Sequence, residues 1–195
     1  MTPRILIIPG SDRDGSHNIQ LAGAIANGIA LNGGEPALAS ISDYALPLFS
    51  QNIEQRTGVP YGAKKLGGLM EKHQGVVLVS PEYNGSIPPL LKNTLDWLSR
   101  DLDGVKPYQN RVFALASCSP GGLGGIRMLS HLRDVLVSVG AEVISPQTAV
   151  GNAHQAFSEH GELVSDRPRA LLQKMTETLI ERTRQLPPLG NSHER

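Results

Sequence analysis

Several features are scarce in this sequence, and each scarcity excludes a class of protein. There is a single cysteine, Cys118, so no disulfide can form within the chain. Basic and acidic residues balance at 18 each without a long block of one sign, which argues against a nucleic-acid-binding surface. No apolar run approaches a membrane span, and Pro9 and Gly10 break the opening segment too early for a signal peptide. We therefore expect a cytoplasmic protein that acts on neither nucleic acid nor membrane.

The six histidines show no metal-ligand spacing and no zinc motif is present, so we expect no metal. Hydrophobic residues make up 39% of the chain and charged residues 18%, which is typical of a globular protein. A chain of 195 residues suffices for one full core. We expect a single domain over residues 1–186 and a disordered tail over residues 187–195.

Short apolar runs alternate with segments of helical periodicity. The apolar runs predict strands at residues 4–8, 36–41, 75–79, 111–117 and 142–145. Helices are expected from about residue 18 to 31, over 60–73, from about 88 to 98, from about 126 to 139 and over 167–184, with a long loop at 42–58 and irregular chain at 151–165. This alternation predicts an α/β fold in three layers, with helices on both faces of a five-stranded parallel sheet in the flavodoxin-like order 2-1-3-4-5.

The segment GSDRDGSHN, residues 10–18, joins the first predicted strand to a helix start. Its Ser11, Ser16 and Asn18 supply short polar side chains, and a helix N-terminus attracts anions. Arg13 can donate two parallel hydrogen bonds to a phosphate. A few charge-assisted bonds of about 1.5–3 kcal/mol each would hold a phosphomonoester firmly.

Two other interpretations of this segment remain. Gly10 and Gly15 have the spacing of a nucleotide-binding P-loop, but Ser16 and His17 follow where that motif requires Lys and then Ser or Thr. An NTPase is therefore not expected. The alternative without a ligand is an ordinary helix start with Ser16 as N-cap.

A second loop follows the strand at residues 75–79. The chain breaks at Pro81, turns through Asn84 and Gly85, and enters a helix for which Ser86 is the expected N-cap, ahead of two prolines. This rigid loop carries one aromatic ring, Tyr83, and suits a flat ligand with polar edges. In open α/β sheets ligands bind at this end of the strands. An ordinary turn made of turn-forming residues is the alternative.

A third, glycine-rich loop occupies residues 117–125. It lacks the third glycine of a dinucleotide fingerprint, because Arg127 stands there. Ser117, Ser119 and backbone N–H groups could face the edge of a ring system, whereas the alternative is a close-packed glycine turn. Cys118 has no neighbour in the sequence that would lower its pKa, so we do not expect a nucleophile.

The segment PEYNGSIPPLLKNTLDWLSR resembles the flavin-contacting segment of the NADPH-dependent FMN reductase family. The first and third loops and YALPLF, residues 44–49, are also similar to that family, and the resemblance covers about residues 4–179. It implies a flavodoxin-like fold and an enzyme that passes a hydride from NADPH or NADH to bound FMN. Ping-pong transfer to a quinone, azo compound, metal oxyanion or free flavin would follow. The resemblance also implies a homodimer or dimer of dimers with FMN at the subunit interface.

The resemblance assigns residues to FMN without assigning a catalytic side chain. The implied phosphate ligands are Ser11, Arg13, Ser16, His17 and Asn18, the residues along the ring are Pro81, Glu82, Tyr83, Asn84 and Gly85, and those on its other side are Ser117 and Ser119. Asp12 and Asp14 add negative charge near the phosphate, and Arg100 is a candidate for the 2′-phosphate of NADPH. A flavodoxin-type electron carrier without NADPH oxidation is one alternative, although such carriers are usually acidic. A flavin-free interaction protein is the other.

Overall fold

Six parallel strands form the centre of the molecule. The computed structural model describes residues 2–11, 13, 15–187 and 189, so the predicted tail lies almost wholly outside the described residues. The strands are β1 (Arg4–Pro9), β2 (Glu35–Leu38), β3 (Gly75–Val79), β4 (Val112–Cys118), β5 (Glu142–Val143) and β6 (Thr148–Val150). Their order is β2-β1-β3-β4-β5, with β6 also paired to β4, which confirms the flavodoxin-like order.

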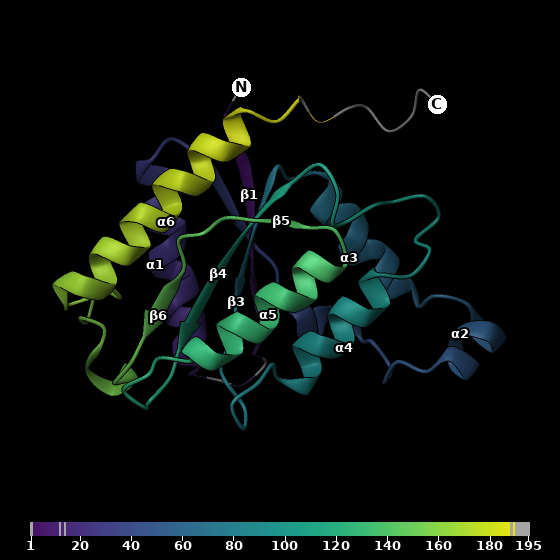
Figure 1. The fold of residues 1–195 in the computed structure, drawn as a ribbon, viewed down its shortest axis with the longest axis horizontal. Coiled ribbons are helices and arrows are strands. Elements are labelled where there is room, and N and C mark those ends of the chain that lie inside the picture. The colour runs from purple at the N-terminus through teal and green to yellow at the C-terminus, as the bar shows by residue number, and fades with distance from the viewer. Residues whose placement is uncertain (1, 12, 14, 188, 190–195) are drawn as a thin grey trace.

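Helices cover both faces of the sheet. They are α1 (His17–Leu31), α2 (Gln51–Thr57), α3 (Tyr61–Glu71), α4 (Pro89–Leu98), α5 (Ile126–Ser138) and α6 (Asp166–Arg184), with short 3-10 turns at Ile41–Tyr44 and Ala153–Gln155. Figure 1 shows α1 and α6 on one side and α3, α4 and α5 on the other. Alternate strand residues serve the two cores, since Ile5 and Ile7 pack toward α1 and α6 whereas Leu6 and Ile8 face the other helices.

Two short strands flank β4 on its outer side: β5 lies within the predicted strand at 142–145, whereas β6 was not predicted. β5 pairs only with the start of β4, and β6 pairs with its end. Pro146 lies between them and has no N–H to donate to a ladder. The Arg133 guanidinium fills the break, donating to the carbonyl of Ser145 at 3.4 Å and to Gln147 Oε1 at 3.1 Å. The sheet thus has six strands where five were predicted, because the edge strand is interrupted.

The region before α3 also differs from expectation. The predicted strand at 36–41 ends at Leu38, and the predicted loop at 42–58 contains the last three residues of a 3-10 turn and all of α2. None of the residues of α2 is buried, so the sequence there carries no core-facing periodicity. In α6, Leu171 is 39% exposed, whereas its neighbour Leu172 packs into the core.

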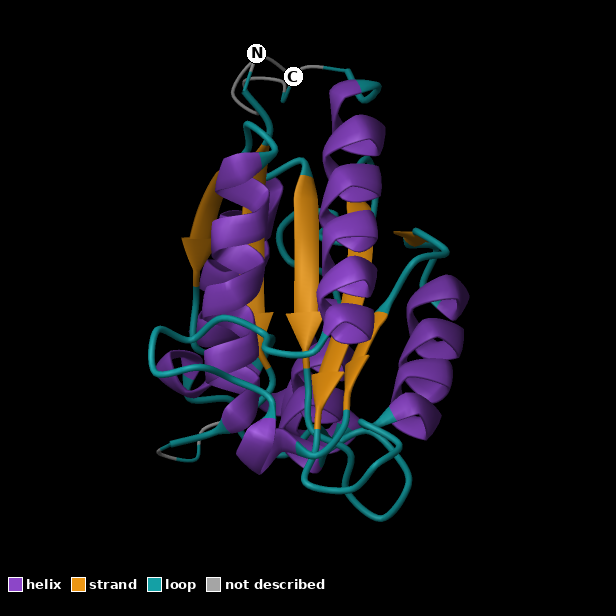
Figure 2. Cartoon of the chain, turned by 90° about the vertical axis from the view of Figure 1, so that its left-hand side faces the viewer, coloured by secondary structure: helices purple, strands orange, loops and turns teal. Residues whose placement is uncertain are grey.

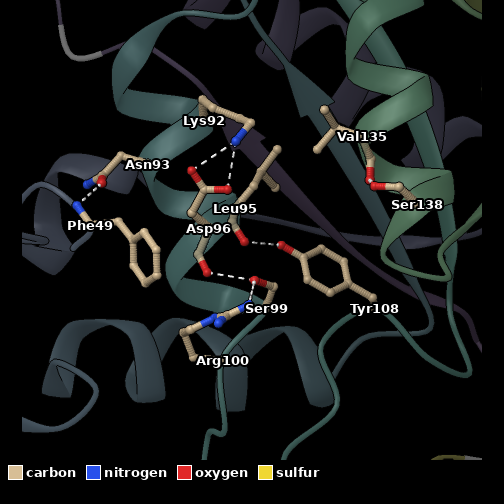
Figure 3. A network of polar contacts seen from close by, with 10 residues as sticks. All are labelled: Phe49, Lys92, Asn93, Leu95, Asp96, Ser99, Arg100, Tyr108, Val135 and Ser138. Atoms are coloured by element: carbon tan, nitrogen blue, oxygen red, sulfur yellow. Dashed lines mark hydrogen bonds and ion pairs between the residues drawn. The ribbon is translucent and has the colours of Figure 1, made fainter. Parts of the chain in front are cut away.

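α4 holds the segment that precedes α2. Trp97 is fully buried, and its indole N–H donates to the carbonyl of Pro47 at 2.7 Å. Asn93 accepts from the N–H of Phe49 at 2.7 Å, a contact drawn in Figure 3. Trp97 is therefore a core residue that fixes residues 47–49 of its own chain, and it is not exposed to a partner subunit.

Two glycines of α3 provide a matched test of the contact between α3 and the 3-10 turn at Ile41–Tyr44. A Cβ on Gly62 would overlap the carbonyl oxygen of Tyr44, whereas a Cβ on Gly68 would meet nothing within 4 Å. We expect Gly62→Ala to lower the free energy of unfolding by about 1–3 kcal/mol. Gly68→Ala should raise it by about 0.5–1 kcal/mol, because alanine costs less backbone entropy in a helix. Urea denaturation measures both, and equal effects would contradict the close approach.

Candidate functional site

The three loops singled out in the sequence begin side by side. The backbone ladder continues one residue past each strand: Gly10 donates to Val79 at 2.8 Å, Ser80 to Ala116 at 3.0 Å and Ser119 to Val150 at 3.0 Å. Figure 2 shows the loops gathered at the end of the sheet toward which the long strands point, which is the carboxyl end of those strands. We call these segments the first loop (residues 10–16), the second loop (residues 80–88) and the third loop (residues 119–125). The prediction that these loops follow the carboxyl ends of neighbouring strands is therefore confirmed.

The first loop presents hydroxyl groups at the start of α1. Ser11 and Ser16 are both buried, and Ser16 Oγ accepts the N–H of Asn18 at 3.2 Å, so Ser16 is the N-cap. Arg13 is exposed, and its backbone N–H lies 3.4 Å from Ser11 Oγ. Hydroxyl groups, helix N–H groups and an exposed guanidinium are a donor set that suits a phosphate. Residues 12 and 14 lie outside the described residues, so the effect of their charge stays a prediction.

His17 and Asn18 begin α1 with different surroundings. The His17 ring packs edge-on against His154, with 5.1 Å between centroids, and its Nδ1 lies 3.2 Å from Gln20 Oε1. The buried Asn18 amide reaches across to β4, where it donates to the Cys118 carbonyl and accepts the Cys118 N–H, both at 2.9 Å. Asn18 thereby joins the start of the first helix to the strand that leads into the third loop. Its predicted contact with phosphate stays a prediction.

The second loop contains a closed four-residue turn. Tyr83 and Ser86 exchange two backbone hydrogen bonds of 3.0 Å each, and both Asn84 and Gly85 between them have positive φ angles. Such a turn favours Asn followed by Gly. The Tyr83 ring at its start is 48% exposed. The turn therefore offers a rigid edge with one accessible ring.

The predicted helix N-cap at Ser86 is wrong. Pro88 is the N-cap of α4 and Pro89 its first residue. Ser86 is occupied by the turn, and its hydroxyl lies 3.0 Å from His131 Nδ1 on α5. Because the turn extends through Ser86, the helix can begin only two residues later.

Glu82 connects the second loop to α5. Its side chain is only 8% exposed, and its carboxylate accepts from Arg127 Nε at 2.8 Å and from the N–H of Met128 at 3.2 Å. The residue before α5 is Gly125, which has no side chain to cap the helix. The Glu82 carboxylate supplies that cap by accepting the N–H of Met128, which lies 46 positions later in the chain. No local pattern could have revealed this contact, and the predicted role of Glu82 beside FMN stays a prediction.

This contact makes stability depend on pH. Burial acts to raise the pKa of Glu82, but the hydrogen bonds from Arg127 and Met128 outweigh it and hold that pKa below its ordinary value. A carboxyl with a lowered pKa stabilises the fold fully above its unfolded-state pKa, about 4.3. That stabilisation is lost as the pH falls through the folded-state pKa.

We therefore expect Glu82→Gln to destabilise the protein by a constant amount from about pH 5.5 to 8 and by progressively less below about pH 4. Urea denaturation of wild type and variant across this range measures the difference. Glu159→Gln, at an exposed loop position, serves as the control. A difference that persisted unchanged to pH 3 would show that the charge of Glu82 is not involved.

The end of β4, just before the third loop, adds one unsatisfied group. Ser117 is fully buried, and its Oγ has no hydrogen-bond partner among the described residues. A Cβ on Gly125 would overlap this hydroxyl, so glycine is required there for the close approach. Ser119 Oγ donates to the Gly121 carbonyl at 3.2 Å. The Ser117 hydroxyl is thus buried without a partner beside Gly125, and its predicted contact with FMN stays a prediction.

Other reactive groups lie outside this arrangement. Burial raises the pKa of the Cys118 thiol to about 12, so it is protonated at neutral pH and a poor nucleophile. Across the part of the chain that the structure describes, no three His, Cys, Asp or Glu side chains come together as a metal site. The helices in that same part include none with the length and apolar character to cross a membrane.

Arg100 is placed away from the loops. It follows α4, at the end of the helix opposite the second loop, and its guanidinium lies over the Phe49 ring, 5.4 Å from the centroid, and 4.0 Å from Glu54. Figure 3 shows its hydrogen bond to Ser99. Within one chain Arg100 therefore does not reach the three loops, and its suggested role toward NADPH gains no support.

The sheet order and the loops at its carboxyl edge define a flavodoxin-like α/β protein. The structure is similar to FerB, a flavoenzyme NAD(P)H:(acceptor) oxidoreductase from Paracoccus denitrificans, with a TM-score of 0.80 at 22% identity over 95% of this chain and 99% of that chain. It also matches an archaeal flavodoxin with a TM-score of 0.58 at 11% identity over 93% of this chain and 99% of that one.

Comparison of the sequence with known proteins assigns the chain to one family within this fold. The profile of the NADPH-dependent FMN reductase family matches residues 3–155, and the chain belongs to this family. It is 34% identical over 152 residues to the quinone reductase of Escherichia coli K12, covering 78% of this chain and 79% of the relative. It is 30% identical over 177 residues to an NAD(P)H-dependent FMN reductase of Pseudomonas aeruginosa, covering 90% and 92%. The resemblance seen in the sequence is confirmed: the chain is an NAD(P)H-dependent oxidoreductase of the FMN reductase family.

Proposed function

We propose that this protein reduces small organic acceptors, quinones first, with electrons from NAD(P)H that pass through bound FMN. The observation that carries this proposal is the adjacency of the three loops, which begin one residue beyond neighbouring strand ends. Relatives named quinone reductase at 34% identity and NADPH azoreductase at 30% identity support the acceptor class. Azo compounds, metal oxyanions and free flavin are further acceptors of the same proposal.

The first loop would hold the FMN phosphate. Ser11 and Ser16 would donate hydroxyl hydrogen bonds, Arg13 would close over the phosphate from solvent, and the N–H groups at the start of α1 would add their partial positive charge. His17 would contribute through its backbone. Asn18 would act chiefly by fixing the helix start against β4.

The second and third loops would hold the ring of FMN, which supplies the chemistry of hydride acceptance from NAD(P)H and electron delivery to the acceptor. Pro81 and the turn from Tyr83 to Gly85 would lie along it. The N–H of Tyr83 is taken by Ser86, so the N–H groups of Asn84 and Gly85 are the ones that could stabilise negative charge on a reduced ring. Ser117 and Ser119 would face its other side.

The test is the visible spectrum of purified protein loaded with FMN, recorded without oxygen before and after NADPH is added. We expect bound flavin whose absorbance bleaches, followed by recovery when a benzoquinone is added. Because both substrates would use one pocket, initial-rate plots should be parallel lines, as in ping-pong kinetics. Bound flavin that NADPH cannot reduce would indicate an electron carrier instead, and failure to bind FMN would refute the proposal altogether.

Assembly and location are part of the same proposal. A homodimer or dimer of dimers would complete the site at a subunit interface. Leu48 and Tyr61 are large apolar side chains, 78% and 80% exposed, that such an interface could cover. A cytoplasmic location stays a prediction from the single cysteine.

A further inference from the structure

A cavity adjoins the third loop on the side away from the second loop. β4 pairs with β3 on one side and β6 on the other, so the third loop separates the second loop from the end of β6. The cavity, about 720 Å³, lies between the third loop, β6 and the start of α6. A hydrogen bond joins the third loop to the residues after β6: the N–H of Asn152 donates to the Gly121 carbonyl at 3.3 Å. One wall is therefore shared by the proposed FMN site and this cavity.

The cavity combines an apolar surface with amide groups. Leu123, Ile126 and Leu171 line it and remain exposed, Leu123 by 61%. Asn152 and Gln155 also line it and offer both donors and acceptors. Apolar walls with a few polar groups suit a heteroaromatic ring such as a purine.

The charge of the cavity has one sign. Arg167, in the first turn of α6, is the only charged residue among the described residues that line it, and no hydrogen bond or ion pair of its guanidinium occurs among them. Two residues later Arg169 is fully engaged, with bonds to the Leu163 and Val164 carbonyls and to Asp166. An unpaired guanidinium in a cavity without carboxylates is complementary to a phosphate.

We propose that this cavity binds the adenosine end of NADPH, with Arg167 against the 2′-phosphate. The inference rests on the proposed function. If the nicotinamide lies at the second loop and the first loop holds the FMN phosphate, the adenosine end can reach this cavity by crossing the third loop, which lines both sites. A 2′-phosphate against Arg167 would then favour NADPH over NADH.

The test uses FMN-loaded protein and compares Arg167→Gln with wild type in steady-state oxidation of NADPH and of NADH. We expect the KM for NADPH to rise about 10- to 100-fold, as for loss of a charged phosphate contact. The kcat, the KM for NADH and the affinity for FMN should change less than about twofold. Lys174→Gln, an exposed position farther along α6 that does not line the cavity, is the matched control and should leave all four values unchanged.

A binding experiment tests the same site without turnover. Adenosine 2′,5′-bisphosphate should bind the FMN-loaded wild type in calorimetry and inhibit competitively with NADPH, and it should bind more tightly than adenosine 5′-phosphate. Arg167→Gln should abolish that difference, and Leu171→Glu should weaken both ligands. If wild type oxidises NADPH but Arg167→Gln leaves its KM unchanged, this inference fails while the proposed function stands. If wild type does not oxidise NADPH at all, the proposed function itself fails.

Discussion

Asn18→Ala is expected to lower the free energy of unfolding by about 2–6 kcal/mol, because it leaves the N–H and the carbonyl of Cys118 buried without partners. Each unsatisfied buried group costs about 1–3 kcal/mol. The start of α1 would also lose its attachment to β4, so affinity for FMN should fall together with stability. Urea denaturation and FMN titration measure the two effects.

Asn27 provides the control for this prediction. It lies on the same helix but is exposed, and no side-chain hydrogen bond of Asn27 occurs among the described residues. Asn27→Ala removes the same amide, and we expect a change within about 0.5 kcal/mol, as for ordinary surface substitutions. If both alanine variants had equal stability, the clamp between α1 and β4 would contribute nothing.

Arg13→Ala is expected to weaken FMN binding about 10- to 150-fold, which corresponds to losing a charge-assisted contact of about 1.5–3 kcal/mol. Arg13 is exposed, so folding should be unaffected. Quenching of FMN fluorescence at fixed ionic strength measures the affinity. Full retention of FMN would remove Arg13 from the phosphate site.

Two further variants separate charge from geometry at this position. Arg13→Lys keeps the charge but loses the planar fork, and we expect an intermediate affinity. Arg56→Ala removes a guanidinium from α2, where Arg56 donates to the carbonyl of Asn52. It should leave FMN binding unchanged, and an equal loss in this variant would indicate a general electrostatic effect instead of a specific contact.

The sheet order and most element positions could be predicted because parallel strands covered on both faces are continuous apolar runs. The stretch at residues 75–79 is fully buried and was recognised on that basis. Elements without a buried face give no periodic signal and could not be predicted in this way. α2 has no buried residue, and β6 is three residues long after a proline.

The candidate site was predictable in part for a similar reason. In a parallel sheet, every loop that follows a strand lies at the carboxyl end of the sheet, so the three loops could be placed together from local patterns alone. The contacts that fix those loops to one another could not. Asn18 meets Cys118 across 100 positions, and Glu82 meets Arg127 across 45. Neither of the two segments in such a pair contains a sequence pattern that predicts the contact.

The broken strand pair β5 and β6 has a consequence for association. A long continuous edge strand exposes a row of unpaired backbone groups on which another chain can align. Here that row is split into pieces of two and three residues around Pro146, and the opposite edge, β2, is four residues long and contains Pro36. Neither border of the sheet offers a template for sheet-to-sheet aggregation, so copies of this chain should meet through helices and loops.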